Sequence, residues 1–321
     1  MATQNIVVPP ARASLFLTLV VRDGHEKDVR AVLAGVSDLE KSVTFRNPPP
    51  EMQVNIGIGS KLWDRMITAI PRPTFLTPFT PVQGAKHQAP ATDGDILVHV
   101  RAEQIDQAFE FSRLLLEQMG EAIEVVDEVH GFKFFDNRDL LGFVDGSANP
   151  TQNDAFKAAL TSRDQDPHYE GSSYVIVQKY LHNMQAWDSL TVEEQERVIG
   201  RYKLNDVEIP DNVKATNSHV ALNSITDDEG NEHEILRDNM PFGTLGSKEF
   251  GTYFIGYAGD PSIIELMLRH MYIGNPEGNY DRILDFSTPH TGAKFFVPTK
   301  DFLDGIDDLP LPVTKKTNRA S

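Results

Sequence analysis

The regular succession of strand-like and helical stretches constrains the fold more than any other feature of this chain. Residues 13–21 form a β-rich run, and residues 26–42 follow with apolar side chains at the three- and four-residue spacing of a helix. After a break at Asn47–Pro50, residues 52–59 alternate as a strand and residues 61–70 predict a short helix. Strands that are repeatedly followed by helices predict an α+β protein.

The same unit recurs along the rest of the chain. Further strands are predicted at 96–101, within 123–135 and at 173–180, and further helices at 105–119 and 192–200. The closest internal echo pairs residues 96–119 with residues 251–271, because each segment is a strand, a turn and an apolar helix. The pattern fits either a duplicated fold or a chance recurrence of a common strand–helix unit.

One segment departs from the pattern. Residues 71–95 are rich in proline and polar residues. The segment exceeds the roughly 12–15 residues at which structureless loops become uncommon in compact domains. We therefore expect it to wrap the surface or to cover a site.

Composition sets the class of protein. The chain has 321 residues, 40% of them hydrophobic and 24% charged, which is typical of a globular protein large enough for two domains. No apolar run reaches the length of a membrane span, and the start lacks the pattern of a signal peptide, so a cytoplasmic location is expected. The formal charge of −17 argues against a nucleic-acid partner and against an anionic membrane surface.

The absence of cysteine excludes several chemistries. With no cysteine in the sequence, the chain has no disulfide, no iron–sulfur cluster and no thiolate ligand for a haem iron. Covalent attachment of haem through a Cys-X-X-Cys-His motif is excluded as well. Any haem in this protein must be held non-covalently.

Three separated segments supply groups that suit redox chemistry with peroxide. Gly142–Gly146 sets one carboxylate, Asp145, after a hydrophobic approach and beside glycine. An imidazole follows at His219 and a guanidinium at Arg237. An acid, an imidazole and a guanidinium in this order indicate a haem peroxidase.

These residues resemble the dye-decolourising peroxidases, whose signature of Gly, any, any, Asp, Gly is here Gly142–Gly146. The spacing from His219 to Arg237 and the later run Gly278–Arg282 are similar to the bacterial class B branch of that family. The resemblance covers most of the chain. It implies two ferredoxin-like halves with antiparallel sheets backed by helices, as in a dimeric α+β barrel, which we place at residues 1–150 and 151–321.

The resemblance assigns the iron ligand to the second half. It implies one non-covalent haem b per chain, with His219 as the metal ligand and Asp281 as the acceptor for the other ring nitrogen. Asp285 is the second choice for that acceptor. From the residues alone, His219 is better explained as a core histidine, and the resemblance reverses that preference. His270, inside a predicted apolar helix, is its rival as the iron ligand.

The other catalytic groups are also placed by the resemblance. Asp145 is expected to move protons on peroxide, Arg237 to stabilise negative charge, and Asn239 to orient peroxide or a water. Gly146 lets the backbone approach the haem, and Ser147 lies beside it at the cofactor. An isolated Asp-Gly pair is more often a turn.

Arg237 also has a structural alternative. An arginine among acids usually forms an ion pair, and Asp238 and Glu234 are both near it in the sequence.

The function that these groups imply is reduction of hydrogen peroxide through an oxo-ferryl intermediate, with oxidation of a bulky dye or phenolic donor. The alternatives are a haem carrier or haem-processing protein of deferrochelatase type, which needs His219 but not both Asp145 and Arg237, and a binding module without haem. We expect a homo-oligomer whose partners are peroxide and a small reducing molecule.

Trp63, Trp187 and the tyrosines are candidates to relay electrons or to pack the core. The basic tail at 313–321 is a candidate docking segment.

Overall fold

The computed structural model describes residues 2–45, 52–227 and 229–310. The expected break at Asn47–Pro50 and the candidate docking tail at 313–321 lie outside the described residues.

The first half forms an antiparallel sheet of four strands. In the order of the sheet these are β2 (Met52–Gly59), β5 (Ile96–Ala102), β1 (Ala13–Val21) and β6 (Ile123–Phe132). Because the chain runs β1, helices, β2, β5, helix, β6, this order is that of a ferredoxin-like unit. The alternating pattern of the sequence predicted all four strands.

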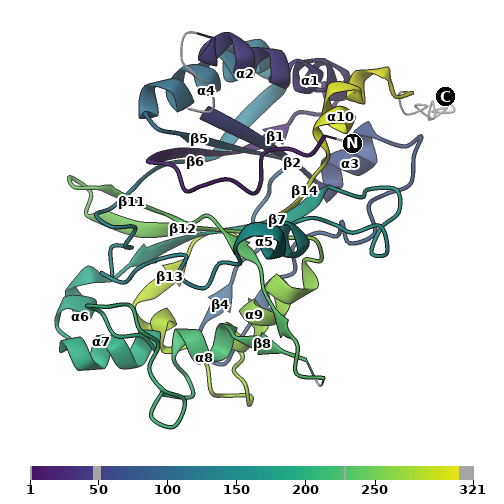
Figure 1. The fold of residues 1–321 in the computed structure, drawn as a ribbon. Helices are drawn as coiled ribbons and strands as arrows, with labels where there is room; N and C mark the ends of the chain where they lie inside the picture. Colours follow the sequence, from purple (N-terminus) through teal and green to yellow (C-terminus); the bar gives the residue numbers. More distant parts are fainter. Residues whose placement is uncertain (1, 46–51, 228, 311–321) are drawn as a thin grey trace, which may run out of the picture.

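Helices cover the outer face of this sheet (Figure 1). They are α1 (Glu26–Ala34), α2 (Val36–Thr44), α3 (Ser60–Met66) and α4 (Ile105–Met119). The prediction of one helix over residues 26–42 was wrong, because the helix is interrupted at Gly35, whose N–H closes a tight turn on the carbonyl of Val32 at 3.0 Å. The interruption lets both short helices bury apolar side chains on the sheet.

The proline-rich segment 71–95 is ordered by packing. It contains a small hairpin of β3 (Val82–Gln83) and β4 (Gln88–Ala89), which lies against α9 (Ser262–Tyr272). A Cβ atom on Gly84 would lie 1.9 Å from the carbonyl oxygen of Tyr272. The loop therefore wraps the surface of the second half in close contact with it.

The second half repeats the strand order of the first. Its sheet runs β14 (Ala293–Val297), β7 (Ser173–His182), β12 (Glu249–Ala258) and then β11 (Met240–Thr244), all antiparallel. Two short strands extend it: β10 (Leu236–Arg237) pairs with β12 and β13 (Ser287–Pro289) with β7. The predicted α+β fold of two ferredoxin-like halves is confirmed by this topology.

The remaining elements are short and lie outside the two sheets. The helices are α5 (Gln152–Ala159), α6 (Met184–Asp188), α7 (Val192–Ile199), α8 (His219–Asn223) and α10 (Lys300–Asp304). The strands β8 (Ile225–Thr226) and β9 (Glu232–His233) form a separate hairpin, and 3₁₀ turns cover Gly120–Ala122, Arg282–Asp285 and Ile306–Asp308.

The two sheets face each other across a common interior (Figure 1). They are joined where β14 pairs with β2, and they approach again where the side chain of Met240 on β11 covers Gly131 on β6. Rings from both halves fill the interior; Phe16 stacks on Tyr253 with centroids 4.1 Å apart. The result is the closed arrangement of a dimeric α+β barrel within one chain.

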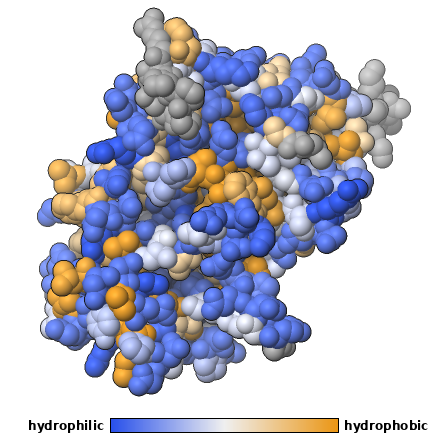
Figure 2. Space-filling view, in the orientation of Figure 1, coloured by the Kyte–Doolittle hydropathy of each residue, from blue (hydrophilic) through white to orange (hydrophobic). Residues whose placement is uncertain are grey.

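The outer surface is largely polar on the face that Figure 2 draws. Figure 2 shows one face that is mostly hydrophilic, with apolar side chains gathered in its middle. Within the ranges that the structure describes, no helix is both long and apolar enough to cross a membrane.

Candidate functional site

A large cavity opens on the outer side of the second sheet. It offers about 1150 Å³ of space, counting its open mouth, between the loop of residues 139–148, helices α8 and α9, and strands β7, β10 and β12. One part of its wall is apolar; it includes Ile235, Phe254, Ile264, Met267, Met271 and Ile283. A broad apolar ligand fits such a wall.

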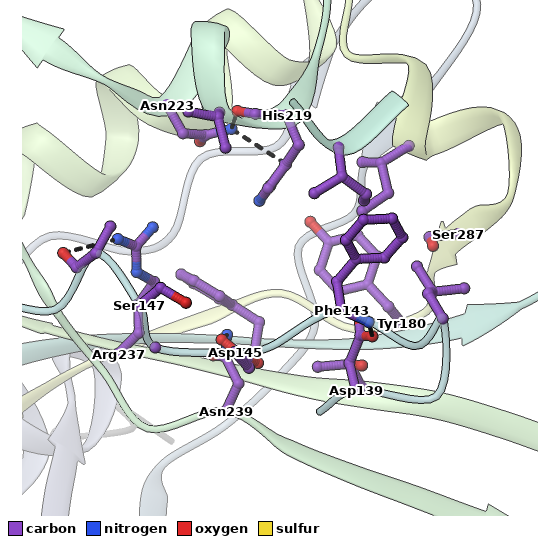
Figure 3. A pocket seen from close by; sticks show the side chains of 18 of the residues that line it. Asp139, Phe143, Asp145, Ser147, Tyr180, His219, Asn223, Arg237, Asn239 and Ser287 are labelled. Atoms are coloured by element: carbon purple, nitrogen blue, oxygen red, sulfur yellow. Dashed lines mark hydrogen bonds between the residues drawn. The ribbon is translucent and has the colours of Figure 1, made fainter. Parts of the chain in front are cut away.

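His219 projects into the cavity from the first turn of α8 (Figure 3). The helix begins there because the Ser218 hydroxyl accepts a hydrogen bond from Ala221 N at 3.3 Å. The Nδ1 atom of His219 lies 2.7 Å from Oδ2 of Asp281, which is completely buried. Within the described part of the chain, no hydrogen-bond partner is found for Nε2, which points into the cavity.

The Asp281 carboxylate controls the state of this imidazole. Burial lowers the pKa of His219, but the charge and hydrogen bond of Asp281 outweigh burial and leave the pKa above its usual value. The second oxygen of Asp281 accepts from Ile283 N at 3.0 Å, which holds the carboxylate in place. The hydrogen bond therefore directs the Nδ1 proton to Asp281 and leaves Nε2 as the free nitrogen.

The two alternatives to these residues lie elsewhere. Asp285 bonds Lys86 at 2.5 Å and His87 at 3.0 Å, on the side of the 71–95 loop. His270 is half-buried on α9, where its Nδ1 lies 3.2 Å from the carbonyl oxygen of Leu222. Neither residue lines the cavity.

Asp145, Arg237 and Asn239 face His219 across the cavity (Figure 3). The amide nitrogen of Asn239 donates to Oδ1 of Asp145 at 3.2 Å, and its oxygen accepts from Ile255 N at 3.0 Å. Burial lowers the pKa of Arg237, and the negative charges of Asp145 and Glu234 oppose that effect. The cavity thus has an imidazole nitrogen on one side and an acid with a guanidinium on the other.

Arg237 does not form the ion pair that its neighbours in sequence suggested. Asp238 pairs instead with Arg101 at 3.1 Å. The backbone of Arg237 is held by Asn149, whose side-chain oxygen accepts from Arg237 N at 3.0 Å and whose amide donates to the Arg237 carbonyl at 2.6 Å. Asn149 was missed by the sequence reasoning, although it follows the Gly142–Gly146 motif closely.

Gly146 and Ser147 form the rim of the cavity beside Asp145. Gly146 adopts a left-handed conformation with φ of +82°, which turns the chain along the cavity wall. Ser147 donates to Asp206 at 2.5 Å. This bond ties the rim to the loop after α7, which also carries Arg201.

Arg201 and Asp139 line the same cavity and were not predicted. Arg201 donates to the Asp206 carbonyl at 2.7 Å and brings a second guanidinium to the site. Burial, followed by the negative charge of Asp145, raises the pKa of Asp139 to about 7. Asp139 lies just before the Gly142–Gly146 motif, where its carboxylate accepts from Phe143 N at 3.0 Å, and its nearness to that motif is the signal that could have found it. No local pattern marks Arg201.

The comparison with protein families now identifies the chain. The model described as "Dyp-type peroxidase, N-terminal" matches residues 3–133, and "Dyp-type peroxidase, C-terminal" matches residues 136–302. The chain therefore belongs to the Dyp-type peroxidase family, as the resemblance predicted, and is a peroxidase. The predicted domain boundary after residue 150 stays a prediction.

Relatives at high identity support this assignment over nearly the whole chain. The dye-decolorizing peroxidase of Rhodococcus erythropolis is 53% identical, with 96% of this chain and 89% of the relative covered. The one of Mycobacterium tuberculosis is also 53% identical, with 97% and 92% covered. A solved DypB variant of Rhodococcus jostii RHA1 in complex with heme has a TM-score of 0.92 at 53% identity, covering 94% of this chain and 98% of that one.

A more distant likeness concerns the alternative function. The deferrochelatase of Escherichia coli K12 is 24% identical over 66% of this chain and 58% of its own length. The sequence identity and the coverage are thus much higher for the peroxidases than for this deferrochelatase.

Proposed function

We propose that this peroxidase binds one haem b per chain in the cavity, with His219 as the ligand of the iron. The donor set supports this proposal. An imidazole nitrogen without a partner among the described residues points into a wide cavity with an apolar wall. Arg201 and Arg237 bring positive charge that suits the two carboxylates of a haem b.

His219 and Asp281 act as a unit in this proposal. Asp281 takes the hydrogen bond from Nδ1, which fixes the orientation of the ring and raises the basicity of Nε2 as a ligand. When bound, the haem iron supplies the two-electron reduction of the peroxide O–O bond. Everything else at the site is the movement of protons and the stabilisation of charge by residues of this chain.

Asp145 and Arg237 lie on the side of the cavity opposite His219. Asp145 moves protons there, and Arg237 stabilises negative charge. Asp145 takes a proton from the first oxygen of hydrogen peroxide and returns it to the second, which leaves as water. Arg237, which is always positively charged at working pH, stabilises negative charge on the peroxide oxygens. Asn239 holds Asp145 in orientation and has one amide hydrogen left for peroxide or a water.

A single observation carries the choice of peroxidase over haem carrier. The cavity that holds the free nitrogen of His219 also holds an acid and a guanidinium opposite it. A carrier requires a ligand for the iron, but it has no use for a positioned acid–base group with a charge stabiliser. Hydrogen peroxide is the electron acceptor, and the electron donor is then a small reducing molecule, in agreement with the name "dye-decolorizing peroxidase" of the relatives.

The test uses protein reconstituted with haemin and mixed with one equivalent of hydrogen peroxide in a stopped-flow spectrometer. We expect Asp145→Asn or Arg237→Leu to keep the Soret band and to slow the reaction with peroxide by about 10²-fold or more. Asp154→Asn, on exposed α5, is the matched control and should react at the wild-type rate. Unchanged rates in both single variants and in the double variant would contradict the assignment.

The proposal includes two further properties of the protein. We propose a cytoplasmic location and a homo-oligomer in solution. Light scattering coupled to size-exclusion chromatography measures the oligomeric state, and a monomer at micromolar concentration would remove that part of the proposal.

A further inference from the structure

Asp238 lies between two residues that face the cavity, yet it points away from the cavity. Arg237 and Asn239 line the cavity, whereas Asp238 does not, and its side chain is only 12% exposed. Its carboxylate accepts from Arg101 on β5 at 3.1 Å, in the first half of the molecule. The segment therefore presents two groups to the site and anchors the intervening one in the interior of the barrel.

Arg101 is the other side of this anchor. Its side chain is 2% exposed, and its guanidinium donates to Asp238, to the side chain of Asn55 on β2, and to the carbonyls of Asn5 and Ile6. An arginine remains charged when buried, so this site requires a negative partner. One cation thus connects two strands of the first half and the N-terminal arm to the segment that carries Arg237 and Asn239.

The same segment is held on its other side by β12. Asp238 N donates to the Ile255 carbonyl at 3.1 Å, and Ile255 N donates to the side chain of Asn239 at 3.0 Å. These two bonds fix the position of the segment relative to β12. Asn149 holds the backbone of Arg237 at the start of the segment. Asp238 and Asn239 lie between the end of β10 at Arg237 and the start of β11 at Met240, and the side chain of Asp238 ties this stretch to the interior.

We propose that Arg101 and Asp238 are positioning residues for peroxide activation, which fix the direction in which Arg237 and Asn239 enter the cavity. The inference rests on the proposed function of Arg237 and Asn239. It assigns a role in the reaction to a strand of the first sheet, β5, although the cavity itself is lined by residues 139–287.

The enzymatic test separates positioning from simple stabilisation. Asp238→Ala removes the acceptor, whereas Asp238→Asn keeps an oxygen for Arg101. We expect D238A to bind a full complement of haem and to react with peroxide about 10- to 100-fold more slowly, with an unchanged KM for the reducing dye. D238N keeps the oxygen that holds Arg101 but loses the negative charge, so it should be less stable than the wild type and still recover to within about threefold of its rate.

A matched control removes a different ion pair, one in which the lysine is buried and the glutamate is exposed. Lys294 is 2% exposed and pairs with Glu265 at 2.7 Å, outside the residues that line the cavity. K294M should lower stability without slowing the reaction with peroxide. If D238A reacts as fast as K294M and the wild type, the positioning role is overturned. If D238A does not fold, R101K takes its place, because lysine keeps the charge but lacks the planar fork that reaches several acceptors.

A second measurement does not need haem. Hydrogen–deuterium exchange of the haem-free protein should show faster exchange at residues 237–239 in D238A, with recovery in D238N and no change in K294M. Unchanged exchange there would overturn the inference. Failure of the wild-type holoprotein to react with peroxide would instead remove the proposed function and leave the exchange result standing.

Discussion

At the scale of single residues, the side chain of His219 is constrained at one nitrogen and free at the other. Asp281 is fully buried and bonds Nδ1 at 2.7 Å, so the ring cannot rotate without breaking a charge-assisted bond. This combination is what a metal-ligating histidine requires. It also explains why His270, which bonds a backbone carbonyl outside the cavity, is the weaker candidate.

We predict that His219→Ala loses most of its haem, since the proposed bond from the protein to the iron is removed. His270→Ala is the matched control and should keep the Soret band of the wild type. The measurement is the absorbance of each variant after haemin reconstitution and gel filtration. A normal Soret band in H219A, together with its loss in H270A, would exchange the two assignments.

Asp139 carries a prediction about pH. Its pKa is raised from 3.8 to about 7 by burial and by Asp145, so the folded protein keeps a proton that the unfolded chain releases between those values. The wild type should therefore lose stability from this group as pH rises from 4 to 7. Asp139→Asn removes that loss and should gain about 1–3 kcal/mol in the free energy of unfolding relative to the wild type over this range.

Urea unfolding of the haem-free protein at pH 4.5, 5.5 and 7 measures this difference. Asp136→Asn is the control, because a hydrogen bond from Arg138 lowers the pKa of exposed Asp136 and any contribution is lost only at acid pH. Parallel pH curves for D139N and the wild type would show that Asp139 titrates normally.

At the scale of elements, packing corrected one expectation based on pattern and gave detail to another. A helical period predicted one helix where Gly35 separates two. The proline-rich segment 71–95 wraps the surface as expected, and it does so through a docked hairpin. The hairpin lies on α9, whose inner face lines the cavity through Ile264, Met267 and Met271. The 71–95 segment thus supports the cavity wall from behind.

We predict that Gly84→Ala destabilises the protein by about 1–3 kcal/mol, because the added Cβ would meet the Tyr272 carbonyl at 1.9 Å and the backbone must move. Gly246→Ala is the control, since a Cβ there would have no neighbouring atom within 4 Å. Urea unfolding compares the two variants. Equal midpoints would mean that the hairpin does not depend on its contact with α9.

At the scale of the whole molecule, the two halves share one interior. Trp63, in the first half, packs on the rings of Tyr169, Phe296 and Phe302 from the second. The chain also returns at its end to the first half, where Arg30 donates to the Asp307 carbonyl at 3.0 Å. Unfolding of one half alone would expose apolar side chains of the other half to water.

We predict that both halves unfold in a single transition. Trp187→Phe leaves Trp63 as the fluorescence probe, and Trp63→Phe leaves Trp187, which is buried against Phe143 and Phe286 in the second half. In urea, the fluorescence of each variant should follow its own circular dichroism transition. Separate transitions in either variant would show that the halves are independent domains.

Local sequence predicted most of the long strands, most helices and the α+β class, because hydrophobic period and turn residues act over a few positions. Strands β11 and β14 were not predicted from it. The ordered set of Asp145, His219 and Arg237 was enough to indicate the family. The resemblance placed Asp281 ahead of Asp285 as the partner of His219, and the tertiary structure shows that contact. Only the tertiary structure decided that Asp238 meets Arg101 instead of Arg237. These pairs join residues that are 62 and 137 positions apart, and no short-range pattern encodes a contact that forms only when two sheets close on each other.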